Sequence, residues 1–314
     1  MTELLRLNYF VNCIHNCNEC EKYFDCNSDY KASIEYKPIV RKLREKMKNI
    51  RYKIAVMGGK GGVGKSTVSA NLAIALAKNH KVGLIDMDFD GPSIPRLLRV
   101  KEKRMKLRDE GFSIIPAEGP LGIKVISTGL VYDEDQAIIW QFKQRQAAIE
   151  QFLSLVDYGE LDFLVMDLPP GTGSETVNLL KYLPDLSGIV IVTIPAELAR
   201  DVTLRGIRLC QKAGAPVIGL VENMSGIICP DCQTVIPAET NAGENLAKTT
   251  GINLLGKIAY DPRVTDLADR GVAFMENGNE MLIANTFSQI VSQIEHFLSL
   301  KSHRHSPRTY QSQT

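Results

Sequence analysis

Short apolar runs alternate along this chain with longer stretches in which apolar positions recur every three or four residues. The short runs are typical of buried strands and cover residues 53–57, 82–86, 162–167, 188–193 and 217–222. The longer patterns are typical of helices and cover residues 66–77, 136–156, 175–183, 197–213 and 279–300. This alternation favours the α/β class, with a mostly parallel sheet wrapped by helices on both faces.

Three segments depart from the alternation. Residues 113–128 contain two apolar runs around a Glu-Gly-Pro turn, and we expect an inserted hairpin there. Residues 37–53 hold eight Lys or Arg against one Glu, which is typical of a solvated helix or linker, although a nucleic-acid arm has the same composition. Residues 302–314 are polar and are predicted to be disordered. We divide the chain into a Cys-rich segment (1–36), a basic linker or helix (37–50), an α/β domain (51–300) and a tail (301–314).

Composition narrows the class of partner. Of the 314 residues, 44% are hydrophobic and 23% are charged, which is ordinary for a globular protein. The net charge of +1 argues against a nucleic-acid or membrane partner. No apolar run has the length of a transmembrane helix, and the first residues lack the apolar core of a signal peptide. We therefore expect a cytoplasmic protein, in which seven cysteines indicate metal or thiol chemistry rather than disulfides.

A glycine-rich loop lies between the first predicted strand and the first predicted helix. From Gly59 to Ser66 it matches the P-loop pattern G-x-x-x-x-G-K-[ST]. In this pattern Lys65 neutralises nucleotide phosphates and the Ser66 hydroxyl binds Mg²⁺. The alternative, a glycine-rich turn with incidental lysines, does not explain the order of strand, loop and helix. The residues predicted to hold ATP here are Gly59, Gly61, Gly62, Val63, Gly64, Lys65, Ser66 and Thr67, and Lys60 adds a second lysine to the loop.

Two predicted strands end in aspartate, at Asp86 and Asp167. Ligands of open parallel sheets bind beyond the carboxyl ends of the strands, so both carboxylates are expected beside the P-loop, near Mg²⁺ and the attacking water. Asp88 and Asp90 follow closely, and for each a water-orienting role and a turn-forming role remain open. The Pro- and Gly-rich run after Asp167 has the composition of a switch, in which Gly171 allows close approach to the γ-phosphate.

Four motifs in sequence order carry a family resemblance. They are the P-loop with its second lysine, Asp-x-Asp-x-x-Gly-Pro-Ser at 86–93, Asp-x-Pro-Pro-Gly-Thr-Gly at 167–173, and Val-Glu-Asn-Met-Ser at 221–225 ahead of a Cys-Pro-x-Cys motif. Over about residues 51–298 the chain resembles the Mrp/ApbC family of iron–sulfur cluster carrier ATPases. This family lies in the group that includes the nitrogenase iron protein and MinD, the P-loop NTPases with a deviant, signature-lysine Walker A motif.

The resemblance implies a homodimer with ATP at the subunit interface. Lys60 then matches the signature lysine that reaches the partner's nucleotide, and Asn223 and Asp261 match positions that hold adenine. Asp90 resembles the acidic switch residue of the nitrogenase iron protein, where an aromatic residue or Cys is usual. This difference leaves the hydrolysis rate and the switch geometry open. The other departures from the family pattern are Ser174 and Ala259.

Cys229 and Cys232 form a C-x-x-C motif in a predicted loop. Two thiolates cannot fill a four-coordinate site, but two copies related by a two-fold axis supply four. This number fits a [4Fe–4S] cluster that bridges the dimer, which is also what the resemblance implies. A zinc ion shared by two chains and a redox pair remain alternatives. Cys210 lies in a helical apolar pattern and is predicted to be a core residue.

A second set of cysteines lies near the N-terminus, with the spacing C-x₃-C-x₂-C-x₅-C. Four thiols so close together are enough for a complete [4Fe–4S] site in one subunit. Some members of the family carry an N-terminal cluster, and Cys17, Cys20 and Cys26 match their pattern, whereas Cys13 does not. The fourth ligand is therefore open, and a zinc site in which His15 competes as a ligand is the alternative.

These patterns predict an ATPase that carries a [4Fe–4S] cluster and transfers it to apoproteins, with slow ATP hydrolysis as the switch. The expected partners are a second copy of the chain, apo iron–sulfur recipient proteins and cluster assembly factors. A partitioning ATPase with structural metal is the alternative, although it gives Cys229 and Cys232 no role. An electron-transfer ATPase is a third possibility. The predicted catalytic residues are Lys60, Lys65, Asp86 and Asp90.

Overall fold

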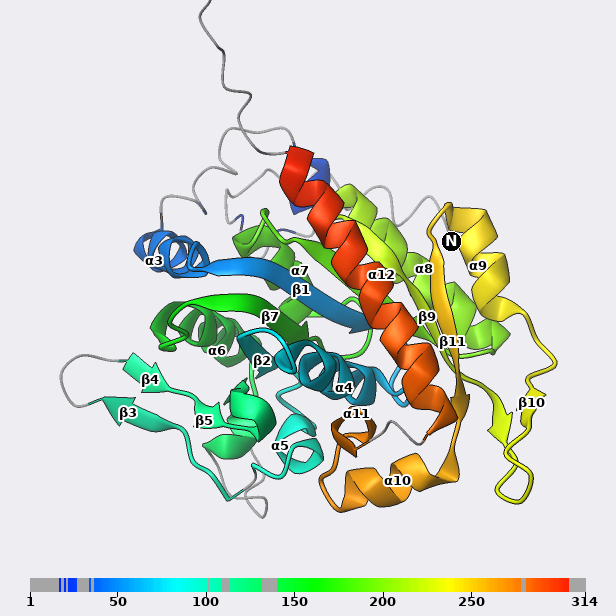
Figure 1. Cartoon of the computed structure of the whole chain (residues 1–314). Coiled ribbons are helices and arrows are strands. Elements are labelled where there is room, and N and C mark those ends of the chain that lie inside the picture. Colours follow the sequence, from blue (N-terminus) through cyan, green and yellow to red (C-terminus); the bar gives the residue numbers. More distant parts are fainter. Residues whose placement is uncertain are drawn as a thin grey trace, which may run out of the picture.

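The computed structural model describes residues 17, 20, 22–26, 34, 37–100, 102–108, 113–131, 140–277 and 281–304. A twisted sheet crosses the molecule (Figure 1). Its strands are β1 Ile50–Gly58, β2 Val82–Asp86, β5 Ala117–Glu118, β6 Lys124–Ile126, β7 Leu161–Asp167, β8 Gly188–Thr193, β9 Val217–Ile228, β10 Val235–Pro237 and β11 Leu254–Tyr260. The strand order is β10-β9-β8-β1-β7-β2-β6-β5, and β11 also pairs with β9.

The sheet is parallel except at its ends. β1 pairs in parallel with β7 and β8, and β2 pairs in parallel with β7 and β6. Within the described sheet, the antiparallel pairs are β5 with β6 and β10 with β9. The structure thus confirms the predicted α/β class, and it places the strand that precedes the P-loop in the middle of the sheet.

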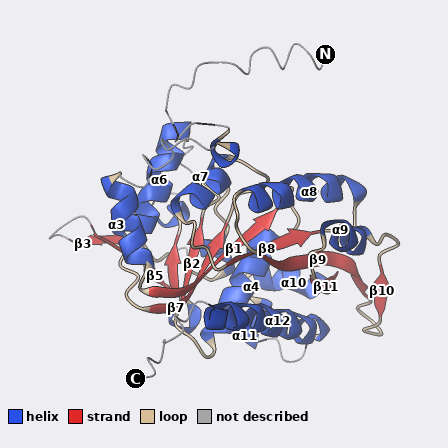
Figure 2. Ribbon diagram, turned by 90° about the horizontal axis from the view of Figure 1, so that it is seen from above, coloured by secondary structure: helices blue, strands red, loops and turns tan. Residues whose placement is uncertain are grey.

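Helices cover both faces of this sheet (Figure 2). They are α3 Pro38–Met47, α4 Lys65–Ala77, α5 Ile94–Leu97, α6 Phe142–Leu155, α7 Ser174–Tyr182, α8 Glu197–Lys212, α9 Ala242–Thr250, α10 Pro262–Asp269, α11 Phe274–Asn277 and α12 Leu282–Arg304. Successive side chains of a strand point to opposite faces, so β1 contributes to two cores. Ile54 and Val56 pack with α4 and α12, whereas Ala55 and Met57 pack with α3, α6, α7 and α8.

Most of the predicted elements are present. The strands at 82–86 and 188–193 have the predicted bounds, while β9 continues six residues beyond its predicted end to Ile228. The helix predicted from residue 136 begins in the structure at Phe142, and residues 132–139 lie outside the described residues. Helix α9 and strand β11 were not predicted, because their apolar runs are short or interrupted.

The prediction of an inserted hairpin at 113–128 is wrong in part. β5 and β6 do form an antiparallel pair around Pro120. However, β6 also pairs in parallel with β2, so it is a strand of the main sheet. The first apolar run instead forms β4 (Ser113–Ile115), which pairs with β3 (Lys106–Arg108) in a separate two-stranded sheet. Local alternation of apolar residues did not reveal this long-range pairing.

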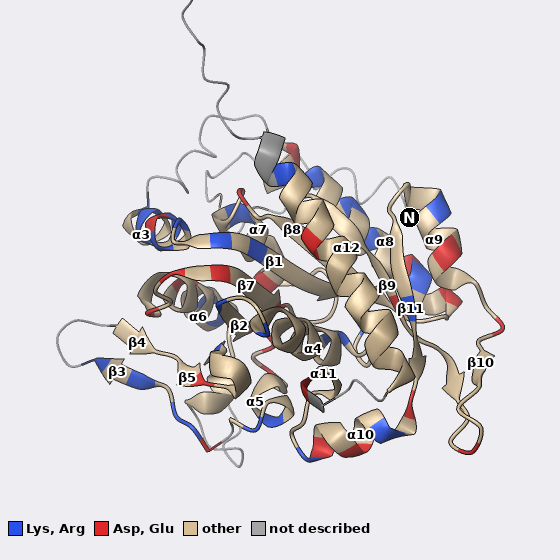
Figure 3. Ribbon diagram, in the orientation of Figure 1, with Lys and Arg blue, Asp and Glu red and all other residues tan. Residues whose placement is uncertain are grey.

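The basic stretch before β1 is a packed helix. Figure 3 shows its Lys and Arg residues in α3 and at the start of β1. Val40, Leu43 and Met47 recur at helical spacing and are buried, and α3 packs against α6. The Nζ of Lys46 also donates to the carbonyl of Val156 at 2.6 Å. The interpretation of this stretch as solvated therefore holds for only one side of the helix.

The ends of the chain are described only in part. Helix α12 continues to Arg304, which lies within the predicted tail, and residues 305–314 lie outside the described residues. Most of the Cys-rich segment at 1–36 also lies outside them. None of the helices in the described ranges is both long enough and apolar enough to cross a membrane. The proposed segment boundaries remain predictions.

Candidate functional site

The P-loop joins the end of β1 to the start of α4. Gly64 precedes α4 in the left-handed conformation (φ 80°), which residues with a side chain rarely adopt. Because it has no side chain to cap the helix, the first N–H groups of α4 remain available to an anion. Gly59 lies against α8, where an added Cβ would be 2.6 Å from the backbone nitrogen of Thr203. The loop and the helix start predicted to hold phosphates therefore have the geometry that phosphate binding requires.

Lys65 lies at the centre of this site. Its side chain is buried, and its Nζ is 3.1 Å from Oδ1 of Asp167 and 3.3 Å from Oγ of Ser66. The Ser69 hydroxyl donates to the same Asp167 oxygen at 2.7 Å. The structure thus brings the predicted phosphate-binding lysine and the strand-end carboxylate of β7 into direct contact.

Asp86 lies beside Asp167, because the register of β2 and β7 pairs these two residues. The Asp86 carboxylate accepts backbone N–H groups of Asp88 and Ile94, each at 3.1 Å. The Ser127 hydroxyl donates to it at 3.3 Å. Burial, together with the neighbouring Asp167 carboxylate, raises the pKa of Asp86 to about 8. The prediction that the two carboxylates meet beside the P-loop is therefore confirmed as geometry, and their roles remain predictions.

The oxygens of this site fit a Mg²⁺ ion bound together with nucleotide phosphates. Oδ2 of Asp167 is buried and has no hydrogen-bond partner. A buried carboxylate oxygen without a partner is costly unless a ligand supplies one. Hydroxyl and carboxylate oxygens, here from Ser66, Asp86 and Asp167, are the ligands that Mg²⁺ prefers.

The loop after β7 reaches the end of β1, directly before the P-loop. Gly171 has a φ of 82°, and its N–H donates to the carbonyl of Gly58 at 2.8 Å. Lys60, Gly61 and Gly62 lie at the exposed outer part of the P-loop. The exposed position of Lys60 is compatible with a reach to a second chain, which remains a prediction.

The two acidic residues that follow Asp86 differ in their surroundings. Oδ1 of Asp88 accepts the backbone N–H of Gly91 at 3.2 Å, which is the turn-forming role left open by the sequence. Asp90 forms a two-point ion pair with Arg145 of α6, with both N···O distances at 2.8 Å. The sequence patterns gave no reason to single out Arg145, since its partner is 55 residues away.

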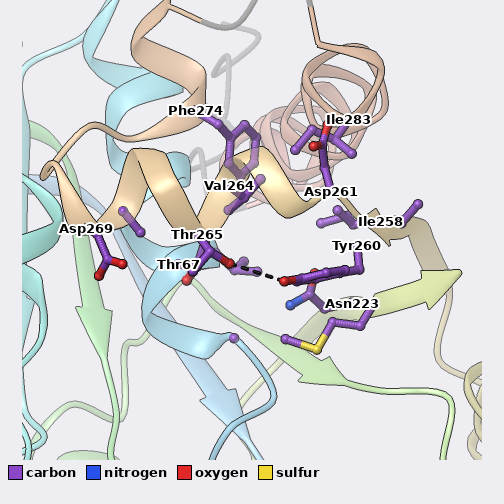
Figure 4. A pocket seen from close by; sticks show the side chains of 15 residues that line it. Thr67, Asn223, Ile258, Tyr260, Asp261, Val264, Thr265, Asp269, Phe274 and Ile283 are labelled. Carbon is purple, nitrogen blue, oxygen red and sulfur yellow. Dashed lines mark hydrogen bonds between the residues drawn. The ribbon is translucent and has the colours of Figure 1, made fainter. Parts of the chain in front are cut away.

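A pocket of about 190 Å³ adjoins the start of α4 (Figure 4). Asn223 lines it, and the Asn223 amide donates to the carbonyl of Val63 at 2.9 Å. Asp261 also lines it, but this carboxylate caps α10 and is bound by Arg263. That ion pair lowers the pKa of Asp261. Both residues predicted to hold adenine therefore lie at one pocket, next to the phosphate-binding loop.

Other residues of the pocket were not found from the sequence. Tyr260 ends β11, and its hydroxyl lies 3.3 Å from the hydroxyl of Thr265 in α10 (Figure 4). Phe274 comes from α11 and Ile283 from α12. The helix at 279–300, which contains Ile283, was predicted, whereas β11, α10 and α11 were not. Tertiary packing brings these residues together at one pocket.

Cys229 and Cys232 lie in the turn between β9 and β10, which projects from the edge of the sheet (Figure 1). The N–H of Cys229 donates to the carbonyl of Thr234 at 3.0 Å, and the N–H of Gln233 donates to the carbonyl of Cys229 at 2.9 Å. These backbone hydrogen bonds hold the two ends of the turn together. Cys229 is half-buried and Cys232 is exposed. Hydrogen bonds from Thr234, with a further one from Cys229, lower the pKa of Cys232 to about 7. Cys232 therefore offers a thiolate ligand at neutral pH.

Two of the described N-terminal cysteines, Cys17 and Cys20, lie against α7. Cys17 is buried, while Cys20 and Cys26 are half-buried. The Nζ of Lys181 donates to the carbonyl of Cys17 at 3.2 Å and lies 3.5 Å from that of Cys20. Across the described part of the chain, no three His, Cys, Asp or Glu side chains gather as a metal site. The N-terminal cluster remains a prediction, and two of its suggested ligands, Cys13 and His15, lie outside the described residues.

The remaining cysteine, Cys210, is fully buried and lies 3.8 Å from the sulfur of Met57. Burial raises its pKa to about 12. The prediction that Cys210 is a core residue is confirmed.

Two solved structures are similar to this fold. A nucleotide-binding protein from Archaeoglobus fulgidus, in complex with ADP and with cobalt, is 35% identical with a TM-score of 0.67. The match covers 77% of this chain and 94% of that one. The cell division ATPase MinD from Pyrococcus furiosus is 22% identical with a TM-score of 0.55, over 78% and 99% of the two chains. The likeness to MinD shows the fold alone.

Sequence comparison gives the family. Two proteins named iron–sulfur cluster carrier protein, from Saccharolobus solfataricus and Methanococcus maripaludis, are 38% and 42% identical to this chain. The matches cover 84% and 83% of this chain and 90% and 89% of theirs. The family model described as ParA, NUBPL iron-transfer P-loop NTPase, matches residues 49–295. The chain therefore belongs to the NUBPL iron-transfer P-loop NTPase family.

Proposed function

We propose that this chain is an ATP-dependent carrier of [4Fe–4S] clusters that works as a homodimer. The observation that carries the proposal is the pair Cys229 and Cys232, held in one turn with no third ligand beside them in the described part of the chain. Two thiolates leave half of a four-coordinate cargo unbound, and a second copy supplies the other half. The names of the relatives from Saccharolobus solfataricus and Methanococcus maripaludis support iron–sulfur clusters as the cargo.

The surface around the cysteine turn supports a second copy as the partner. Ile227, Val235 and Ile236 are 53%, 39% and 58% exposed on the two strands that lead into the turn. Exposed apolar side chains grouped in this way favour contact with another protein surface. A dimer that covers them would bring two cysteine pairs together.

The nucleotide site supports hydrolysis as the switch. Lys65 and, from the partner, Lys60 would neutralise phosphate charge. Ser66, Asp86 and Asp167 would hold Mg²⁺, which offsets charge on the transferred phosphoryl group. The exposed carboxylate of Asp90 would orient the attacking water. Positioning and electrostatics supply nearly all catalysis in such sites, so a slow rate is expected until partner and cargo complete the site.

Anaerobic reconstitution with iron and sulfide tests the cargo. We expect about two iron atoms per chain to be lost in Cys229→Ser/Cys232→Ser, together with the absorbance near 400 nm, because one four-iron cluster is shared by two chains. Cys210→Ala is the matched control, since it removes a thiol from the core and should keep the iron. Iron that remains in the double variant would belong to the N-terminal cysteines.

Two results would contradict the proposal. One is a wild-type chain that binds zinc but no sulfide, which would indicate structural metal. The other is full iron and sulfide retention in the double variant. If the proposal holds, the cluster-loaded chain should also activate an apo iron–sulfur enzyme, and the double variant should not.

A further inference from the structure

Two carboxylates from distant parts of the chain, those of Asp90 and Glu175, meet at Arg145. Its Nη1 and Nη2 donate to the two oxygens of Asp90, both at 2.8 Å, and Nη1 also donates to Oε1 of Glu175 at 2.9 Å. The Nε of Arg145 donates to the carbonyl of Trp140 at 3.1 Å. All three nitrogens of the guanidinium are therefore engaged, and the side chain is held in one orientation.

One carboxylate belongs to the loop after β2, and the other to the start of α7, the helix that follows the loop after β7. Asp90 lies in the loop after β2, four residues beyond Asp86. Glu175 lies in the first turn of α7, directly after the loop in which Gly171 is bonded to Gly58, the residue before the P-loop. Arg145, from the first turn of α6, is thus the link between them.

The two halves of this link differ in exposure. Glu175 is only 6% exposed and Arg145 is 23% exposed, so their ion pair is largely shielded from water, whereas the Asp90 side chain is 63% exposed. Beside them, Phe89 is buried against Trp140 and Phe152, with ring centroids 5.4 and 6.0 Å apart. Two-point pairs between Arg and carboxylate are among the strongest and most directional in proteins.

We infer that Arg145 is a positioning residue for ATP hydrolysis, which fixes the Asp90 loop to the start of α7. This inference rests on the proposed function, because it assumes that the site hydrolyses ATP. Without the guanidinium, two carboxylates would face each other with no cation between them, and they would repel. The two loops would then separate and move independently, while the P-loop itself would be unchanged.

Kinetics and hydrogen exchange test the inference. In Arg145→Gln we expect kcat to fall about tenfold or more with KM for ATP within about twofold, because misplaced groups slow chemistry more than binding. Hydrogen exchange should rise about tenfold at both 88–93 and 174–178, without nucleotide and with Mg-ADP. Arg145→Lys should recover part of the rate but not the two-point geometry.

The control is Arg108→Gln, which removes an exposed ion pair to Asp157 elsewhere on the surface and should match wild type in both measurements. Unchanged exchange in Arg145→Gln would overturn the inference. So would an increase spread evenly over the chain, since that reports lost stability only. If wild type and Lys65→Ala both fail to hydrolyse ATP, the proposed function fails, whereas the exchange data still decide whether Arg145 joins the loops.

Discussion

At the scale of single residues, Asp86 is a carboxyl group that folding removes from water. Its pKa of about 8 in the folded chain lies above the ordinary value of 3.8. Between these values the folded chain binds more protons at this site than the unfolded chain does, so the free energy of unfolding falls as pH rises from about 4 to 8. The stabilising contribution of the protonated Asp86 carboxyl is fully present at pH values below this window.

Thermal unfolding of the metal- and nucleotide-free chain from pH 5 to 8.5 checks this. Asp86→Asn cannot ionise, so its stability relative to wild type should increase steadily with pH. A constant difference between the two proteins would contradict the assignment of the high pKa to Asp86.

The exposed thiol of Cys232 also has a shifted pKa, and its reactivity can be measured. Hydrogen bonds from Thr234 lower its pKa to about 7 from the ordinary 9.0, so its alkylation by iodoacetamide should reach half its maximal rate near pH 7. In Thr234→Val the midpoint should move upward. Peptide mass spectrometry of the metal-free chain measures this rate separately from those of the other cysteines. An unmoved midpoint would show that Thr234 does not set the reactivity.

At the scale of elements, α3 illustrates how a charged segment becomes part of a fold. Leu43 of α3 is completely buried, although most of the residues next to it in the sequence are basic. We expect Leu43→Ala to lower the free energy of unfolding by about 2–5 kcal/mol, as for other buried leucines. Denaturant unfolding measures it, with the exposed Lys42→Ala as control. Equal effects of the two changes would mean that α3 does not contribute to the core.

Some parts of the fold and of the candidate site can be predicted from the sequence, and others cannot. Strands buried on both faces are continuous apolar runs, and the P-loop, Asp86 and Asp167 follow from motifs and from where parallel strands end. Tyr260 lies on β11, whose burial is mixed and whose paired residues on β9 are 33 or more positions away. Arg145 has a role only through Asp90 and Glu175. Such pairings depend on tertiary packing, which local periodicity does not encode.

At the scale of the whole molecule, the sheet joins the two chemical regions. β9 carries Asn223 at the pocket and ends next to Cys229 in the turn. The six residue steps from Asn223 to Cys229 span about 20 Å of chain at the rise of an extended strand. They are not uniformly extended, because Met224 has a φ of 56° directly after Asn223. The strand thus connects the pocket beside the P-loop with the cysteine turn through a short path that has a left-handed position at Met224.

This continuity of β9 has a thermodynamic consequence. If nucleotide at Asn223 alters how firmly the cysteine turn holds its cargo, the cargo must alter the affinity for that nucleotide by the same factor. The loaded and empty forms would then differ in which of ATP and ADP they retain at cellular concentrations. The carrier would report its own loading through the nucleotide it keeps, so that a recipient able to distinguish the two forms would meet a carrier only when it has a cluster to give.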